Sequence, residues 1–462
     1  MNTKRLAQFA QRGIELLSRE DPELYRLLDL ENQRQNEVLA MVAASSVADP
    51  SVLACHGTAT VNVTTEGYPG ARFHAGCEYV DAMERLAVER AKKAFGAQYA
   101  NVQPHSGSSA NAVVLFSLLK PGDTILGLDL NAGGHLTHGS KASVSGQYFN
   151  AVGYGLTPEG YIDYAQVEEL ARTHKPKLII CGASAYPRTI DFKRFRDIAD
   201  AVGAHVLADI SHIAGLVAAG EHPSPIDHAH FTTTSTYKQL YGPRGGLILI
   251  GRDHDAKAPD GKNTLAQMIQ RGVFPYFQGT PDLSTIAAKA RALDNAAKPA
   301  FRALARMIVA DAKKLAELFA AKGYRVLTGG TDNHIVLMDI LSTLNMTGVV
   351  AERALEECNV VVNKNRIAGD KKSALVTSGV RLGTNSLALR GMGPAVMPEC
   401  ADLMHRALSA VTVKGEREYE IDADAKRQCR EQVSALCRRY PIPHYTDSEH
   451  AHAVEAGGRM TG

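Results

Sequence analysis

The sequence predicts an α/β protein in which a mostly parallel sheet is covered by helices and followed by a smaller α+β domain. Between about residues 80 and 300, short apolar runs alternate with helical segments such as "FKRFRDIADAVGA". The runs "KPKLIICGAS", "AHVLADIS" and "GGLILIGR" are typical of strands that a parallel sheet buries on both faces. This alternation stops after about residue 300, and a chain of 462 residues is too long for one compact core. We therefore expect two or three domains.

The order of the elements divides the chain into four segments. Residues 1–45 are expected to form an arm of helices, because "AQRGIELLSRE" and "LYRLLDLENQRQNEVLAMVAA" carry apolar residues at helical spacing. Residues 46–300 form the large domain, where "CEYVDAMERLAVERAKKAFG" is a helix ending at a glycine and "ANAVVLFSLLKPGDTILGLDL" indicates a helix, a turn and a strand. Residues 301–445 form the small domain, with a long helix before the strand-like "HIVLMDI" and "NVVVNKN". Residues 446–462 contain few apolar side chains and are expected to be a disordered tail.

Composition excludes several classes of function. A net charge of +2 and a charged fraction of 22% indicate no binding to nucleic acid or to an anionic membrane surface. No apolar run has the length of a membrane span, and "MNTKRLAQFAQRG" lacks the apolar core of a signal peptide, so we expect a cytoplasmic protein. The seven cysteines include no C-x-x-C pair, so their spacing suggests neither a disulfide framework nor a metal site. His135 and His138 have the spacing of metal ligands, but no third ligand is evident nearby, so we expect no metal.

Three short segments carry candidate chemistry, because ligands in open α/β sheets bind beyond the carboxyl ends of strands. "PHSGSSAN" places Ser106, Gly107 and Ser108 just before a helix, whose free N–H groups and dipole favour a phosphate. "VLADISH" places Asp209 at the end of a buried strand, where a carboxylate is costly without a cationic partner. Lys238 follows a further strand. A lysine, a buried carboxylate and a phosphate cradle are the parts that hold pyridoxal phosphate.

Each of these features has a simpler explanation when it is taken singly. A hydroxyl-rich segment before a helix is commonly a cap, a strand-end aspartate is commonly structural, and most lysines are surface residues. Their order and spacing along one α/β domain favour the cofactor site.

Longer motifs carry a resemblance to a known family. "EGYPGARF", "CEYVDAMERLAVERAKKAFGAQYANVQPHSGSSAN", "GGHLTHGS", "GLVAAG", "GPRGGLIL", "GGTDNH", "VNKN" and "TSGVRLGT" closely resemble serine hydroxymethyltransferase over about residues 35–410. The resemblance implies a fold-type-I enzyme that uses pyridoxal phosphate, with a mostly parallel seven-stranded sheet. It also implies small-molecule amino-acid substrates and a homodimer, or a dimer of dimers, with shared active sites.

The resemblance also implies roles for single residues. The catalytic residues would be Lys238, which forms the Schiff base, Asp209 at the pyridinium nitrogen, His135 stacked on the ring, and Glu66 as the proton-handling carboxylate. The cofactor would further contact Ser106, Gly107, Ser108, Ser184, His212 and, from the partner subunit, Gly279. Arg381 would clamp the substrate carboxylate bidentately, and the remaining substrate-binding residues would be Thr64, His74, Tyr237 and Asn365.

The sequence departs from the family pattern around this expected centre. The usual T-H-K-T is changed at Tyr237 and Gln239, and the arginine three residues after the lysine is Tyr241. Two tyrosines are replaced by Thr64 and His74. The family's A-S-E-N segment is changed at Ala44 and Ser45. Its G-T-P has Asn385 in place of the proline, and its Gly-Gly pair is replaced by Tyr276 and Phe277. Random drift would not be expected to spare the outer motifs and change the centre.

We therefore expect an enzyme recruited to a specialised pathway that acts at Cα or Cβ of a bulkier L-amino acid. Candidate reactions are C–S β-elimination or decarboxylation-deamination of a cysteine S-conjugate, as in lincosamide antibiotic assembly. The alternative is a genuine serine/glycine or α-methylserine hydroxymethyltransferase, or a threonine aldolase or transaldolase, which retained Glu66 and Asn365 favour. The sequence leaves open whether tetrahydrofolate binds. A non-catalytic cofactor-binding regulator is disfavoured by the intact Lys238, Asp209 and Arg381.

Overall fold

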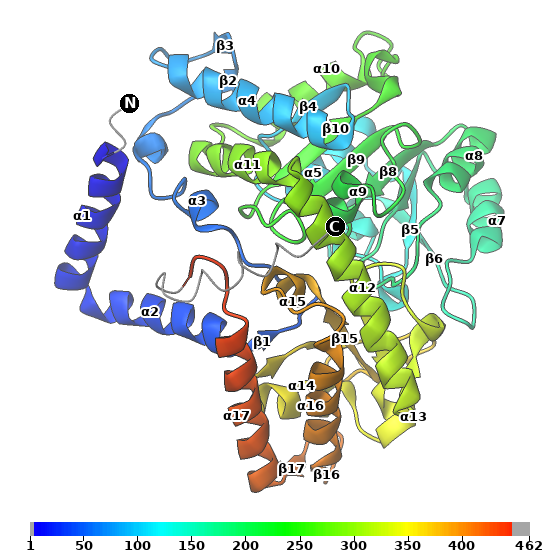
Figure 1. Ribbon diagram of the computed structural model, residues 1–462. Helices are drawn as coiled ribbons and strands as arrows, with labels where there is room; N and C mark the ends of the chain where they lie inside the picture. The colour runs from blue at the N-terminus through cyan, green and yellow to red at the C-terminus, as the bar shows by residue number, and fades with distance from the viewer. Residues whose placement is uncertain (1–3, 446–462) are drawn as a thin grey trace, which may run out of the picture.

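The computed structural model describes residues 4–445. The tail expected at 446–462 lies outside these described residues. Within the described part, two domains lie one above the other, with helix α12 (Pro299–Ala321) running down from one to the other (Figure 1). No helix in the described part is long and apolar enough to cross a membrane.

The large domain is built on a sheet of seven strands in the order β4-β10-β9-β8-β7-β5-β6. The pairs from β6 through β5, β7 and β8 to β9 are parallel, while β10 is antiparallel to both β9 and β4. The mostly parallel sheet expected from the sequence is therefore confirmed. The strands are β4 (Tyr99–Asn101), β5 (Thr124–Leu128), β6 (Asn150–Tyr154), β7 (Leu178–Cys181), β8 (His205–Asp209), β9 (Phe231–Ser235) and β10 (Gly246–Ile250).

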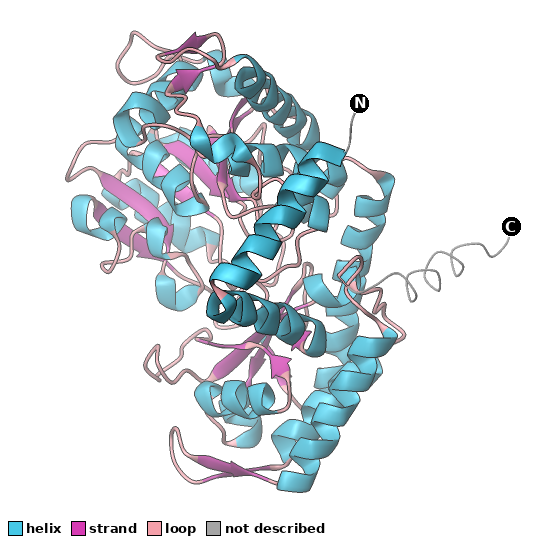
Figure 2. Cartoon of the chain, turned by 90° about the vertical axis from the view of Figure 1, so that its left-hand side faces the viewer, coloured by secondary structure: helices cyan, strands magenta, loops and turns pink. Residues whose placement is uncertain are grey.

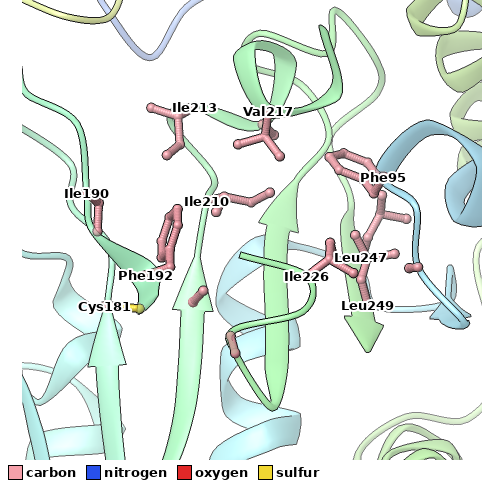
Figure 3. Close-up of a cluster of buried hydrophobic side chains, with 14 of the residues drawn as sticks. Phe95, Cys181, Ile190, Phe192, Ile210, Ile213, Val217, Ile226, Leu247 and Leu249 are labelled. Atoms are coloured by element: carbon pink, nitrogen blue, oxygen red, sulfur yellow. The ribbon is translucent and has the colours of Figure 1, made fainter. Parts of the chain in front are cut away.

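Helices cover both faces of this sheet (Figure 1). The longer ones are α4 (Glu78–Phe95), α5 (Gly107–Leu118), α7 (Tyr164–His174), α8 (Phe192–Val202) and α11 (Leu283–Ala296), with the shorter α6 (Val144–Tyr148), α9 (Ala214–Ala219) and α10 (Leu265–Arg271). Alternate residues of β10 enter different cores, because successive strand side chains point to opposite faces. Leu247 and Leu249 pack in the cluster shown in Figure 3, with Phe95 of α4 and Val217 of α9, whereas Ile248 and Ile250 pack with α5 on the other face.

The small domain has its own four-stranded sheet in the order β11-β12-β15-β14 and its own core. Its elements are β11 (Arg325–Val326), β12 (Ile335–Asp339), α13 (Ile340–Leu344), α14 (Gly348–Glu357), β13 (Val360–Val361), β14 (Asn363–Asn365), β15 (Gly379–Gly383), α15 (Asn385–Leu389), α16 (Met397–Ser409), β16 (Val411–Val413), β17 (Tyr419–Ile421) and α17 (Ala423–Arg439). Helix α12 belongs to both cores: Phe301 and Ile308 pack in the large domain, Leu315 and Phe319 in the small one.

The N-terminal arm is shorter than expected. Helices α1 (Lys4–Glu20) and α2 (Pro22–Glu37) contain no buried residue and stand away from the large domain in Figure 1, so that they pass in front of the rest of the chain in Figure 2. The helix expected to continue to residue 44 ends at Glu37, because Leu39–Ala40 forms strand β1, which pairs with β13 of the small domain. Leu39 and Met41 are fully buried in that domain's core, so tertiary packing overrides the helical spacing of the sequence there.

Between the arm and α4 the chain forms short elements on the surface of the large domain. These are α3 (Pro50–Leu53), the 3-10 turn Ala59–Asn62, and a small hairpin of β2 (Gly67–Tyr68) and β3 (Ala71–Arg72). Arg72 fixes this hairpin to α4 through its ion pairs with Asp81 at 2.8 Å and Glu84 at 2.5 Å. The hairpin therefore holds Glu66, the residue just before it, in a defined place.

Candidate active site

The N-terminus of α5 forms a cradle suited to an anion. Ser106 is the N-cap residue, and its side chain accepts a hydrogen bond from the Ser109 backbone N–H at 3.0 Å. A side chain at position 107 would crowd the cradle, because a Cβ there would lie 3.2 Å from both Ser211 Oγ and Ser235 Cβ. The first N–H groups of a helix have no partner within it, so this end can bind a phosphate.

A buried lysine that the sequence did not reveal supports this cradle from behind. Lys289 on α11 is 1% exposed, and its ammonium donates hydrogen bonds to the carbonyls of Val102 at 2.7 Å, Pro104 at 3.0 Å and Gly246 at 2.9 Å. Burial lowers its pKa to about 7, against the raising effect of Asp282. Lys289 thus joins the segment leading into Ser106 to the start of β10.

Asp209, at the carboxyl end of β8, is buried and surrounded by donors. It accepts hydrogen bonds from Asn111 Nδ2 at 2.8 Å and from the Ser211 N–H at 3.0 Å, and His138 Nε2 lies 3.0 Å from its carboxylate. Burial alone would raise its pKa, but the hydrogen bond and the electrostatic interaction with His138 hold the pKa well below its usual value. Asp209 is therefore an anion inside the domain, able to stabilise a cationic ring nitrogen.

His135 and His138 lie beside this carboxylate. Their rings are 5.6 Å apart, and burial lowers the pKa of His135 to about 4, so its imidazole is neutral at physiological pH. The sequence showed no third ligand near these two residues, whereas the fold brings Asp209 within 4.8 Å of both. The expectation that no metal binds here stays a prediction. The contact between Asp209 and His138 is a hydrogen bond, which supplies the buried carboxylate with one of its donors.

Lys238 lies in the turn between β9 and β10 and is 6% exposed. Burial lowers the pKa of its amine to about 8. The negative charge of Asp209 acts to raise this pKa, and the positive charge of Arg381 lowers it further. Its neighbour Tyr237 is flanked by cations: the guanidinium of Arg244 lies 4.3 Å from the ring centroid and the Lys238 ammonium 5.9 Å from it. A larger share of Lys238 is therefore the neutral, nucleophilic amine than in an exposed lysine.

Arg381 approaches this lysine from the small domain, on β15. Its Nε donates to Asn363 Oδ1 at 3.0 Å, and its Nη1 donates to the backbone carbonyl of Ser184. Burial lowers its pKa only to about 10, so it remains a cation at neutral pH. Of the two asparagines on β14, Asn363 contacts Arg381, while Asn365 donates to the backbone carbonyl of Arg366 at 2.5 Å. The structure thus adds Asn363 to the expected set.

Two buried histidines lie close enough to Lys238 and Arg381 to be affected by the charges of both. The rings of His212 and His334 stack at 5.8 Å with an interplanar angle of 19°. Burial and the charges of Arg381 and Lys238 lower the pKa of His334 to about 3 and that of His212 well below its usual value. His212 Nδ1 is buried without a hydrogen-bond partner among the described residues, which is compatible with a ligand group beside it.

Three of the expected residues form a second group, at the surface. Glu66 lies 3.6 Å from His74 Nε2, and a Cβ at Gly279 would lie 3.2 Å from the Glu66 carboxylate. Their side chains are 40% exposed for Glu66 and 44% for His74, and Thr64 is exposed as well. Among the described residues, no hydrogen bond or ion pair joins Glu66 or His74 to Lys238, Asp209 or Arg381. Gln278, the residue before Gly279, connects this group to the phosphate cradle. Its side-chain oxygen accepts a hydrogen bond from the N–H of His105, next to Ser106, at 3.2 Å.

The residues present fit pyridoxal phosphate. The helix cradle suits its phosphate, the ionised Asp209 suits its ring nitrogen, and the buried amine of Lys238 suits its aldehyde. The residues that sequence reasoning missed are Asn111, Asn363 and Lys289. Asn111 lies within the quoted "PHSGSSAN" segment, but the spacing of Lys289 on its helix gives no sign of its three carbonyl partners.

Comparison with known proteins gives a consistent result. The family model described as serine hydroxymethyltransferase matches residues 17–404. The chain is 48% identical over 423 residues to a serine hydroxymethyltransferase of Alkalilimnicola ehrlichii, covering 91% of this chain and 96% of that protein. It is 47% identical over 433 residues to a serine hydroxymethyltransferase of Methylococcus capsulatus, covering 93% of this chain and 99% of that protein.

Proposed function

This chain belongs to the serine hydroxymethyltransferase family of pyridoxal phosphate-dependent enzymes, and on that premise we propose that it interconverts serine and glycine with tetrahydrofolate as the one-carbon carrier. The observation that carries the proposal is that Lys238 and Arg381 lie in one buried site, on opposite sides of the domain boundary. An α-amino acid would be bound there with its carboxylate on Arg381 and its amino group at the position on the cofactor that Lys238 would otherwise hold.

The residues of this chain have distinct tasks in the proposed reaction. Pyridoxal phosphate, when bound, supplies an electron sink for the electrons released at the substrate's α-carbon. Lys238 would hold the cofactor covalently, and its lowered pKa of about 8 keeps part of it as free amine at neutral pH. Asp209 would keep the ring nitrogen protonated, because its own pKa lies well below its usual value. Arg381 would bind the substrate carboxylate and align the α-carbon.

The exposed group of Glu66, His74 and Gly279 supports a homodimer in which a second copy completes the site. A proton-handling carboxylate is of no use at an open surface, where water would compete for the substrate. Helices α1 and α2 add further unpaired apolar surface, with Leu6 68%, Phe9 55% and Ile14 55% exposed. We propose that these surfaces meet a partner subunit, either in a dimer or in a dimer of dimers, and that the enzyme is cytoplasmic.

A specialised reaction on a bulkier amino acid is the second candidate. It is favoured by Tyr237, whose ring centroid lies 4.3 Å from the Arg244 guanidinium and 5.9 Å from the Lys238 ammonium, and by the exposed residues Thr64 and His74, which replace tyrosines of the family pattern. The high identity to proteins named serine hydroxymethyltransferase, over nearly their whole length, favours the ordinary reaction instead. Cleavage or decarboxylation-deamination of a cysteine S-conjugate remains a prediction from the altered residues alone.

One set of parallel incubations tests the proposal. The purified holoenzyme is given serine with tetrahydrofolate, threonine alone, and a cysteine S-conjugate, and the products are identified by mass spectrometry. The proposal expects glycine from serine at an ordinary enzymic rate, about 1–10³ per second. A thiol with pyruvate and ammonia, or an aldehyde with carbon dioxide, from the conjugate in the absence of serine turnover would establish the second candidate instead.

A further inference from the structure

A buried polar bridge joins the turn between β9 and β10 that carries Lys238, here called the lysine turn, to the small domain. Its centre is Asn385, which is 1% exposed and begins α15. The side-chain oxygen of Asn385 accepts a hydrogen bond from Gln239 Nε2 at 3.3 Å, and its Nδ2 donates to the Ala43 carbonyl at 3.1 Å. Its own backbone carbonyl accepts a hydrogen bond from the Tyr241 hydroxyl at 2.9 Å. Three segments far apart in the sequence therefore meet at one residue.

The bridge joins the two segments that carry Lys238 and Arg381. Gln239 directly follows Lys238, and the Tyr241 N–H donates to the Lys238 carbonyl at 3.2 Å. On the other side, Asn385 follows Arg381 by four residues, across the end of β15. Gln239 is also fixed within the large domain, because its Oε1 accepts from the Leu216 N–H at 3.4 Å. A shift of the lysine turn relative to β15 would break these hydrogen bonds in a buried setting, where unpaired polar groups are costly.

The residues of the bridge are also places where this sequence departs from the family pattern. Gln239 replaces a threonine, Tyr241 an arginine and Asn385 a proline of the pattern that the chain resembles. In the fold Gln239 and Tyr241 both contact Asn385. They are therefore parts of one packed unit, and they do not by themselves enlarge a substrate pocket.

We propose that Asn385 is a positioning residue that fixes the separation between Lys238 and Arg381, and with it the alignment of an amino acid bound at both ends. The inference rests on the proposed function only in requiring that the site binds an α-amino acid. If the bridge is broken, the cofactor can still be held at Lys238, and a primary amine can still take the place of the lysine amine on it. A ligand that must reach this position and Arg381 at the same time would bind more weakly, because alignment has to be restored on binding.

Ligands with and without a carboxylate separate this role from a general structural one. Asn385→Ala and, as a second route to the same break, Gln239→Leu are prepared as holoenzymes, and glycine and methylamine are each titrated against the visible absorbance of the bound cofactor. We expect the glycine dissociation constant to rise about tenfold in both variants, and the methylamine constant to stay within about twofold of wild type. The double variant should be little worse than either single one, since both remove the same contact.

Ser386→Ala is the matched control. Ser386 is the next residue of α15, is also buried, and its hydroxyl has no partner among the described residues, so its removal should leave both titrations unchanged. Equal weakening of glycine and methylamine, or wild-type glycine binding in Asn385→Ala and Gln239→Leu, would overturn the positioning role. Failure of the proposed function would look different: the wild-type protein would bind glycine yet make none from serine and tetrahydrofolate.

Discussion

Asp311 on α12 is a buried carboxyl group whose raised pKa in the folded state should lower the free energy of unfolding at neutral pH. The residue is 0% exposed, and neither of its oxygens has a hydrogen-bond partner among the described residues. Burial raises its pKa from 3.8 to about 8. Replacing it with asparagine keeps a polar group of the same size and removes the titration.

The size of the effect follows from linkage. Between pH 4 and pH 8 the folded state holds this proton and the unfolded state does not, so the free energy of unfolding falls by about 1.4 kcal/mol for each pH unit of increase. Below that window both states are protonated, and above it both are ionised. At pH 7 the accumulated destabilisation is about 4 kcal/mol. An unpaired asparagine retains a desolvation cost of about 1–3 kcal/mol, but that cost does not change with pH.

Denaturant unfolding at several pH values measures the difference. Asp311→Asn should be more stable than wild type at pH 7, and its advantage should grow by about 3 kcal/mol between pH 5 and pH 7. Asp424→Asn serves as control, because Asp424 is 74% exposed beside Arg427 and should change stability by less than about 1 kcal/mol. A stability difference for Asp311→Asn that does not vary with pH would show that the carboxyl group is ionised or solvated in the folded state.

Three further substitutions test the candidate site. Lys289→Met should weaken pyridoxal phosphate binding about 10-fold or more while pyridoxal binding stays nearly unchanged, because only the phosphate needs the cradle; equal losses for both ligands in equilibrium dialysis would contradict this. Lys238→Ala should abolish the yellow absorbance of the bound cofactor and all turnover; a borohydride adduct mapped to another lysine would reassign the role. Arg381→Ala should raise the serine KM steeply, by a contact worth about 1.5–3 kcal/mol, with cofactor still bound; loss of the cofactor and normal KM would make Arg381 a phosphate ligand instead.

Local signals predicted most of the large domain and the order of its chemical groups. The apolar runs at β7, β8 and β10 were recognisable because a strand buried on both faces has no polar residues to interrupt it. Asp209 ends the apolar strand β8, while Ser106 and Lys238 come shortly after β4 and β9, and the carboxyl ends of parallel strands share one edge of the sheet. The helix expected over residues 24–44 ends before Leu39. Pairing of Leu39 with Val360 and its burial in a distant core outweighed the helical spacing of the local apolar residues.

The sequence by itself determined the fold class and the family, and it predicted residues that would hold the cofactor, because each depends on a pattern within a short segment. Only the tertiary structure decided which of those residues meet. It placed Arg381 against Ser184, gave Lys289 its three carbonyl partners, and left Glu66 at an open surface. It also brought Gln239 to Asn385, which lies 146 residues further along the chain. Such contacts are set by how two domains pack, and side-chain packing between distant segments has no period or spacing that a linear sequence can display.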